Sequence, residues 1–164
     1  MSTSDLYRVY RTKASHIAEY RNGWGSAPLL WGYLNEKYLG GTRYGWSGIN
    51  NSPLWALSKD MRVPRSLRIT HAFTFDQSVC PVDRVSELAD ALEEAGKICA
   101  HEQHVNHWAS IAHDLRQTKL KARQIGFALS CTSVCDPWMS WRGDPQCWDT
   151  FAAIGATESE TAKP

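Results

Sequence analysis

Two long amphipathic segments follow one another in the second half of the chain, and an alternating apolar stretch comes directly after them. Residues 81–96 carry apolar side chains three and four positions apart, and residues 100–120 show a similar stripe. This spacing predicts two helices, each with one face to bury. Residues 125–131 alternate large apolar with small or polar side chains, which predicts a strand. Helices and strands with one apolar face can bury those faces against one another, so these segments favour an α+β fold. The stripes are Val85, Leu88, Ala89, Leu92 and Ala95, then Trp108, Ile111, Ala112 and Leu115.

Proline and glycine punctuation predicts two further helices and the end of a third. A capping serine and a proline begin a helix at residues 26–28, and the glycine pair at 40–41 ends it. A serine-proline pair predicts a short helix over residues 52–60. Gly96 suits the C-terminal cap of the helix that begins at Pro81.

The remaining regular segments are two predicted strands and a short helix. Residues 5–11 are rich in aromatic and β-branched types, which predicts a strand, and residues 13–21 are expected to form a short helix. Residues 67–75 alternate strictly, which predicts a strand with one buried face. That face would carry Leu67, Ile69, His71, Phe73 and Phe75.

Together these elements predict one globular domain over residues 1–155. Its core would be a small mixed or antiparallel sheet of about three or more strands, packed with about five helices. A chain of 164 residues has the length of one ordinary domain. Residues 156–164 are polar and are expected to form a disordered tail.

Charge and cysteine content limit the classes of partner and compartment. Eighteen basic and seventeen acidic side chains give a net charge of +1, so no global field attracts nucleic acid or an anionic membrane. Neither a secretion signal nor an apolar run of membrane-spanning length occurs in the sequence. Five cysteines are an odd count that favours reduced thiols. We therefore expect a cytoplasmic protein that does not enter membranes.

Arginine, glycine and tryptophan recur together in three segments without periodicity, at residues 21–26, 43–48 and 138–143. A loop tryptophan offers a flat apolar face, and an arginine can bind a carboxylate or phosphate bidentately. These loops are therefore candidate binding surfaces. The alternative is that the indoles fold inward and plug the sheet, with arginines stacked on them. The candidate binding residues are Arg21, Trp24, Arg43, Tyr44, Trp46, Trp138, Trp141 and Arg142.

His71 is the strongest candidate for a catalytic side chain, because the alternation of residues 67–75 places it on an apolar face. A buried imidazole can have a pKa suited to a general base. Ser130, Cys131 or Ser133 at the end of the last predicted strand could be the nucleophile, with Asp136 nearby as the acid. No G-x-S-x-G elbow or other nucleophile motif accompanies them. A hydrogen-bonded core histidine is the competing interpretation.

Residues 6–11 and 40–44, with Ser47, resemble segments of an ADP-ribosyltransferase. The resemblance implies a role for Arg8, on an early strand, in binding a nicotinamide dinucleotide. Such a site also needs a late glutamate, whereas after Glu102 this chain has glutamates only in its polar tail. An ADP-ribosyltransferase-like or nucleotide-handling transferase is therefore the alternative to a binding protein.

Histidine and cysteine are clustered without the spacing of a metal site. His101, His104 and His107 follow Cys99, but helical zinc pairs usually lie four residues apart, and no C-x-x-C motif is present. Phosphate-loop and dinucleotide fingerprints are missing as well. We therefore expect no metal and no cofactor.

A basic run at the end of the second long helix is the candidate patch for nucleic acid. Arg116, Lys119, Lys121 and Arg123 would complement the helix dipole there, and no nucleic-acid-binding motif accompanies them. Another protein is the expected partner, and a small cytosolic binding or regulatory module is the expected function. An inhibitor encoded by a virus or mobile element is one setting for such a module.

Overall fold

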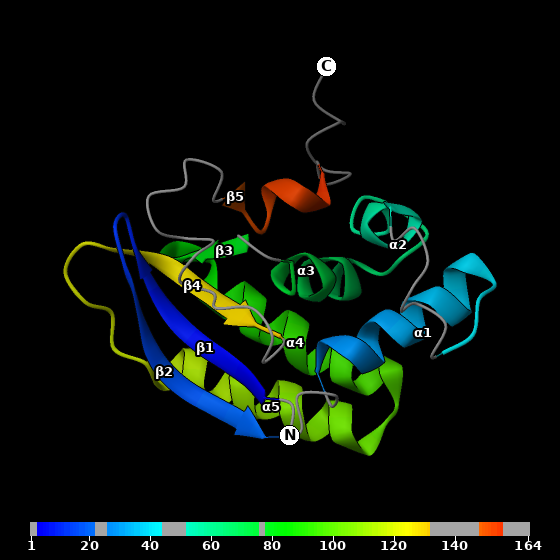
Figure 1. Cartoon of the computed structure of the whole chain (residues 1–164), viewed down its shortest axis with the longest axis horizontal. Coiled ribbons are helices and arrows are strands. Elements are labelled where there is room, and N and C mark those ends of the chain that lie inside the picture. Colours follow the sequence, from blue (N-terminus) through cyan, green and yellow to red (C-terminus); the bar gives the residue numbers. More distant parts are fainter. Residues whose placement is uncertain (1–2, 22–25, 44–51, 76–77, 132–147, 156–164) are drawn as a thin grey trace.

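A computed structural model of the chain describes residues 3–21, 26–43, 52–75, 78–131 and 148–155 (Figure 1). The strands are β1 (Thr3–Tyr10), β2 (Ala14–Arg21), β3 (Ser78–Pro81), β4 (Gln124–Ser130) and β5 (Trp148–Asp149). The helices are α1 (Ala27–Leu39), α2 (Ser52–Ala56), α3 (Arg65–Phe73), α4 (Val85–Cys99) and α5 (Glu102–Gln117). Two short 3₁₀ turns, η2 (Val82–Arg84) and η3 (Ala152–Ile154), complete the described elements.

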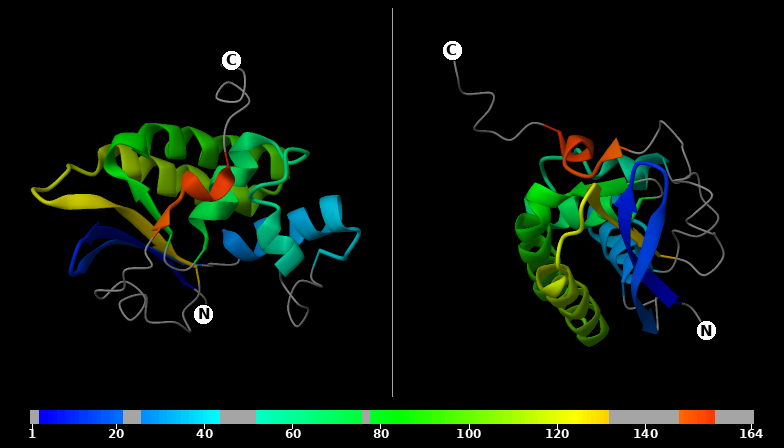
Figure 2. Two further views of the ribbon diagram at one scale, coloured as in Figure 1. Left: turned by 90° about the horizontal axis from the view of Figure 1, so that it is seen from above. Right: turned by 90° about the vertical axis from the view of Figure 1, so that its left-hand side faces the viewer.

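The strands form one sheet in the order β2-β1-β4-β3-β5. The first four strands are antiparallel to their neighbours, and β5 adds a short parallel pairing to β3. Figure 2 shows α4 and α5 side by side on one face of this sheet. The predicted α+β class, with a small mixed or antiparallel sheet and about five helices, is confirmed for the described residues. None of the described helices is both long and apolar enough to cross a membrane.

The main core lies between the sheet and the long helices, as the apolar stripes predicted. Leu92 of α4 and Trp108 and Ile111 of α5 are fully buried, and Leu6 and Phe127 meet them from the sheet. Burial of this apolar area is the principal stabilising term of the fold. The predicted elements at residues 5–11, 26–40, 52–60, 81–96, 100–120 and 125–131 correspond to β1, α1, α2, α4, α5 and β4.

The predicted strand over residues 67–75 is wrong, because this segment forms the helix α3. Arg68, Thr70 and Ala72 are buried together with the four residues that alternate with them. A helix buried all round shows no apolar stripe, so its sequence can also fit the period of a strand. Pro64 precedes the first turn and supplies the extended residue from which the helix begins.

The predicted helix over residues 13–21 is also wrong, because this segment is the edge strand β2. It pairs with β1 from Val9↔Ala14 to Thr3↔Arg21. The Tyr20 hydroxyl donates a hydrogen bond of 2.7 Å to Asp114 of α5, which attaches this edge strand to the helix layer. Tertiary pairing overrides the local preference here.

Two smaller differences concern β3 and Gly96. The strand β3 was not predicted, because four residues are too few to show a period. Gly96 lies inside α4, and the helix ends at Ala100, which takes the left-handed conformation with φ of 49°. Gly96 is buried, so the absence of a side chain suits close packing there.

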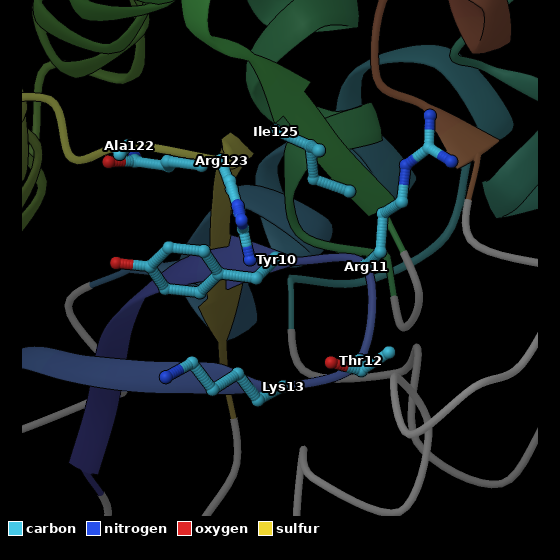
Figure 3. Close-up of a pocket in the computed structure, with 8 residues that line it drawn as sticks. Tyr10, Arg11, Thr12, Lys13, Ala122, Arg123 and Ile125 are labelled. Carbon is cyan, nitrogen blue, oxygen red and sulfur yellow. The ribbon is translucent and has the colours of Figure 1, made fainter.

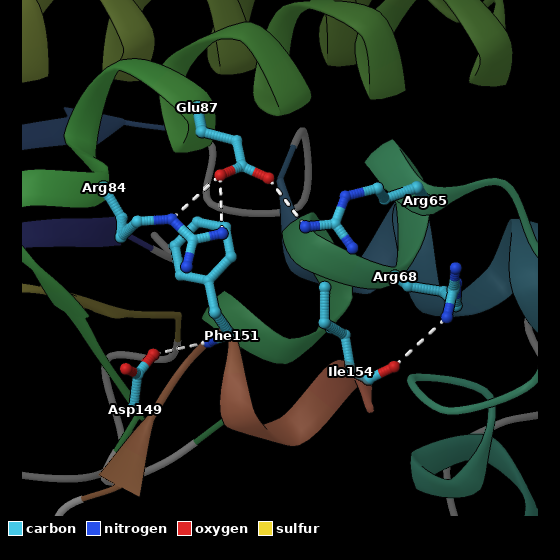
Figure 4. A network of polar contacts seen from close by, with 7 residues as sticks. All are labelled: Arg65, Arg68, Arg84, Glu87, Asp149, Phe151 and Ile154. Carbon is cyan, nitrogen blue, oxygen red and sulfur yellow. Dashed lines mark hydrogen bonds and ion pairs between the residues drawn. The ribbon is translucent and has the colours of Figure 1, made fainter. Parts of the chain in front are cut away.

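The segment after residue 147 is attached to α3 and α4 by arginines (Figure 4). Arg84 lies over the Phe151 ring, 3.9 Å from its centroid, and both Arg84 and Arg65 donate hydrogen bonds to Glu87. Arg68 donates a bond of 3.1 Å to the carbonyl of Ile154. Residues 148–155 are therefore part of the packed domain.

Gly126 marks the closest approach of two strands, and this generates a stability prediction. A Cβ at this position would collide with the Cys80 carbonyl and with the Val79 side chain of β3. We expect Gly126→Ala to lower the free energy of unfolding by ~3 kcal/mol, because two strands must separate to admit the methyl group. Urea unfolding followed by circular dichroism measures the change.

Gly40→Ala is the matched control for that substitution. It adds the same methyl group where nothing lies within 4 Å, and its cost of ~1 kcal/mol comes only from the φ of 70°. Equal losses in the two variants would contradict the close approach of β3 and β4.

Candidate anion-binding pocket

A pocket of about 650 Å³ lies where the β1–β2 turn meets the loop between α5 and β4 (Figure 3). We call it the cationic pocket. Its volume is within the ordinary range for ligand sites. It is lined by Tyr10, Arg11, Thr12, Lys13, Ala122, Arg123, Gln124 and Ile125.

One wall of the cationic pocket is the tip of the β1–β2 hairpin. The Tyr10 amide donates a 2.8 Å hydrogen bond to the Lys13 carbonyl, which closes the turn. The pairing of β1 with β4 shifts register between Val9 and Tyr10, so that Tyr10 lies opposite Gln124. This irregularity brings the hairpin tip against the loop that precedes β4.

The other wall is a loop held by the side chain of Gln124. Its amide nitrogen donates to the Gly126 carbonyl at 3.2 Å, and its oxygen accepts a bond from the Lys121 amide at 3.2 Å. Arg123, between Lys121 and Gln124, has a φ of 64°. This left-handed backbone conformation costs free energy for a residue with a Cβ. Such strain is retained where the surrounding structure imposes it, often at binding sites.

The charged residues among the described lining of the cationic pocket are all basic. Arg11, Lys13 and Arg123 line it, and Lys119 and Lys121 lie in the same loop. The sequence has no carboxylate between Asp5 and Glu19 and none between Asp114 and Asp136. Within the described residues none of the three lining cations forms an ion pair, so their charges are available to an anion.

The lining side chains are arranged along the hairpin tip and do not point at one spot. The Lys13 ammonium lies over the Tyr10 ring, 5.2 Å from its centroid. Figure 3 shows Arg123 directed toward Tyr10, whereas Arg11 extends away from that ring. This distribution fits a ligand that carries several separated negative charges.

The structure groups the basic residues of the predicted patch differently from the sequence. Arg116 does not belong to it, because its guanidinium donates hydrogen bonds to Glu93 at 2.6 Å and Asp90 at 2.7 Å. Arg11 and Lys13 join it instead and were missed, since residues 13–21 were expected to be helical. The hairpin that brings them in is formed by the pairing of residues 14–21 with β1.

Of the predicted binding residues, the structure describes only two arginines. Arg21 is exposed at the end of β2. Arg43 follows α1, where its Nε donates to Glu36 at 3.0 Å. The others lie outside the described residues; they are Trp24, Tyr44, Trp46, Trp138, Trp141 and Arg142.

The three catalytic candidates lie on different elements. His71 is in α3, where its Nε2 donates a 2.9 Å bond to the Leu54 carbonyl and its Nδ1 has no partner among the described residues. Arg8 is half-buried on β1 opposite Phe127. Cys131 is buried directly after β4, where its thiol donates to the Leu129 carbonyl at 3.9 Å. The burial predicted for His71 is confirmed, although its element is a helix.

Among the described residues, no three or more histidine, cysteine, aspartate and glutamate side chains are grouped as a metal site. Cys99 is a buried free thiol, and burial raises its pKa to about 12. His107 is half-buried, which lowers its pKa.

No family model, curated protein or solved structure matches the chain.

His71 makes stability depend on pH. Desolvation lowers its pKa from 6.5 to about 4, although the bond to Leu54 raises it. Between these values the unfolded chain binds the proton more readily, so stability is fully present above about pH 6.5 and falls as the pH drops toward 4. We expect a loss of roughly 3 kcal/mol across this window from His71. Urea unfolding at a series of pH values measures it.

His71→Gln is the test variant, because its amide can still donate to Leu54 and does not titrate. The difference in stability between wild type and variant should shrink as the pH falls from 6.5 to 4. His107→Gln is the comparison for a half-buried imidazole and should produce a smaller change. A pH-independent difference for His71→Gln would show that this imidazole is not the group responsible.

Proposed function

We propose that this protein is a small binding module that captures an acidic segment of another protein through the cationic pocket. The observation that carries the proposal is a set of cations that line the pocket and form no ion pair with any described residue, Arg11, Lys13 and Arg123. A module of this kind would regulate or inhibit its partner by covering an acidic surface.

The surroundings of the pocket support a partner with apolar side chains beside its charges. Leu120 is 57% exposed and Ile125 is 40% exposed, and both lie in or next to the loop that forms the pocket. Exposed aliphatic side chains next to cations match an acidic segment that also carries leucine or a similar residue. Their burial would contribute affinity that the ion pairs alone do not supply.

The aromatic residue of the pocket favours a protein over a nucleic acid. Single-stranded nucleic acids bind through free aromatic faces on which bases stack. The Tyr10 ring already has the Lys13 ammonium over it. The pocket therefore offers charge and aliphatic surface but a poor stacking platform.

We also propose that the protein works in the cytoplasm. The described thiols Cys80 and Cys99 are free and buried, as expected where thiols stay reduced. Burial raises the pKa of Cys80, which keeps this thiol protonated and unreactive.

A defined peptide tests the binding proposal. The probe repeats Glu-Glu-Leu, and its uncharged match has glutamine in place of glutamate. We expect saturable shifts of backbone amide signals around Tyr10, Lys13 and Arg123, weaker at high salt. The double variant Lys13→Gln/Arg123→Gln should bind about fivefold more weakly, since each exposed charge pair contributes up to ~1 kcal/mol.

Lys37→Gln/Lys97→Gln is the control with the same change in net charge. Both lysines are exposed on helices away from the pocket. If the two double variants bind the acidic peptide equally weakly, net charge alone explains the loss of affinity and the proposal is overturned. If the protein binds oligothymidylate more tightly than the acidic peptide, the proposal is also overturned, because the ligand of the pocket would then be a nucleic acid.

A further inference from the structure

A second cavity, also of about 650 Å³, lies between α2 with its following turn and η3. We call it the aromatic cleft. It shares no lining residue with the cationic pocket. It is lined by Ser52, Trp55, Ala56, Ser58, Lys59, Phe75, Ala152 and Ala153.

The aromatic side chains of the cleft are held rigidly by further rings. The Trp55 indole stacks on the His71 ring, with centroids 5.6 Å apart and planes at 17°. Phe75 and Trp31 meet the same indole edge to face, at 5.0 Å and 5.3 Å. A ring fixed on three sides presents its remaining surface without losing rotamer freedom on binding.

Two partners keep these supporting rings in place. The bond from His71 to the Leu54 carbonyl attaches the imidazole to α2, one residue before Trp55. Trp31 donates a 3.0 Å bond from its indole nitrogen to the hydroxyl of Thr74. Because Trp55 remains half-buried after all these contacts, part of its indole faces the cleft.

Small side chains form much of the rest of the cleft. Ala56, Ala152 and Ala153 occupy little volume, which leaves room beside the two aromatic rings. The Ser58 hydroxyl donates a 3.2 Å bond to the Ala153 carbonyl and joins the two sides of the cleft. The cavity therefore lies between connected elements.

The charge of the aromatic cleft comes from one lysine. Lys59 is exposed and lines the cleft, and among the described residues it forms no ion pair. The neighbouring carboxylate of Asp60 is already bound by Arg62, whose Nε donates to it at 3.0 Å. None of the described residues that line the cleft is a carboxylate, so the Lys59 ammonium favours an anion beside an apolar body.

We propose that the aromatic cleft binds a small aromatic carboxylic acid. Its ring would lie against Trp55 and Phe75, because aromatic pairs prefer offset-stacked or edge-to-face contacts. Its carboxylate would meet the Lys59 ammonium at the rim. The volume of the cleft is within the range of small-molecule sites. This site is independent of the binding proposed for the cationic pocket.

Biphenyl-4-carboxylate is the probe, and the uncharged biphenyl-4-carboxamide is its match. Isothermal titration calorimetry and shifts of the amide signals of Trp55, Lys59 and Ala153 should report saturable binding of the acid. Lys59→Gln should weaken the acid about threefold to fivefold and leave the carboxamide unchanged. Ala152→Phe should abolish binding of both compounds, because an exposed alanine on the wall is replaced by a ring that fills the cleft.

Lys97→Gln is the matched charge control and should bind the acid as wild type does. The proposal is overturned if Lys59→Gln and Lys97→Gln weaken the acid equally, or if Ala152→Phe binds it as tightly as wild type. It is also overturned if a short peptide ending in phenylalanine binds there more tightly than the acid, since the occupant would then be a polypeptide terminus. Thermal unfolding of Ala152→Phe at the wild-type temperature shows that loss of binding is not loss of fold.

Discussion

The antiparallel pairing of β1 with β4 is the contact on which the rest of the structure depends. It joins the start of the chain to residues 124–130 and forms the centre of the sheet. Leu6 and Phe127 from this pair face the core under α4 and α5. The same pairing ends with Tyr10 opposite Gln124, so the hairpin tip and the α5–β4 loop must meet. The cationic pocket is therefore a consequence of the strand register.

The parts of the fold that could be predicted from the sequence are those that bury only one face. The long helices α4 and α5 have clear apolar stripes because their other sides are exposed to solvent. These stripes are the pattern that correctly predicts the α+β class. The helix α3 could not be recognised in this way, since Arg68, Thr70 and His71 are buried as well as its apolar residues. The identity of β2 depends on hydrogen bonds to β1, which no local pattern in residues 14–21 reveals.

The candidate site could be predicted only in part for the same reason. Lys119, Lys121 and Arg123 lie at alternate positions within five residues, so the sequence predicts that they form a basic patch. Arg116 was grouped with them because its acidic partners lie on another helix, at Asp90 and Glu93. Arg11 and Lys13 come from the opposite end of the chain. Only the pairing of β1 with both of its neighbours brings the two groups together.

The distribution of ion pairs separates the charges that support the fold from those available for binding. Arg65 and Arg84 share Glu87, and Arg116 binds Asp90 and Glu93 of the neighbouring helix, so these charges join neighbouring elements of the fold. Exposed cations that have no carboxylate partner among the described residues, such as Lys13 and Lys59, contribute little to stability, because water solvates them in the folded and unfolded chain alike. Figure 1 shows the hairpin of the cationic pocket and the α2 side of the aromatic cleft at opposite ends of the molecule. Neutral substitutions of these lysines are therefore expected to leave the opposite end of the molecule and the fold undisturbed.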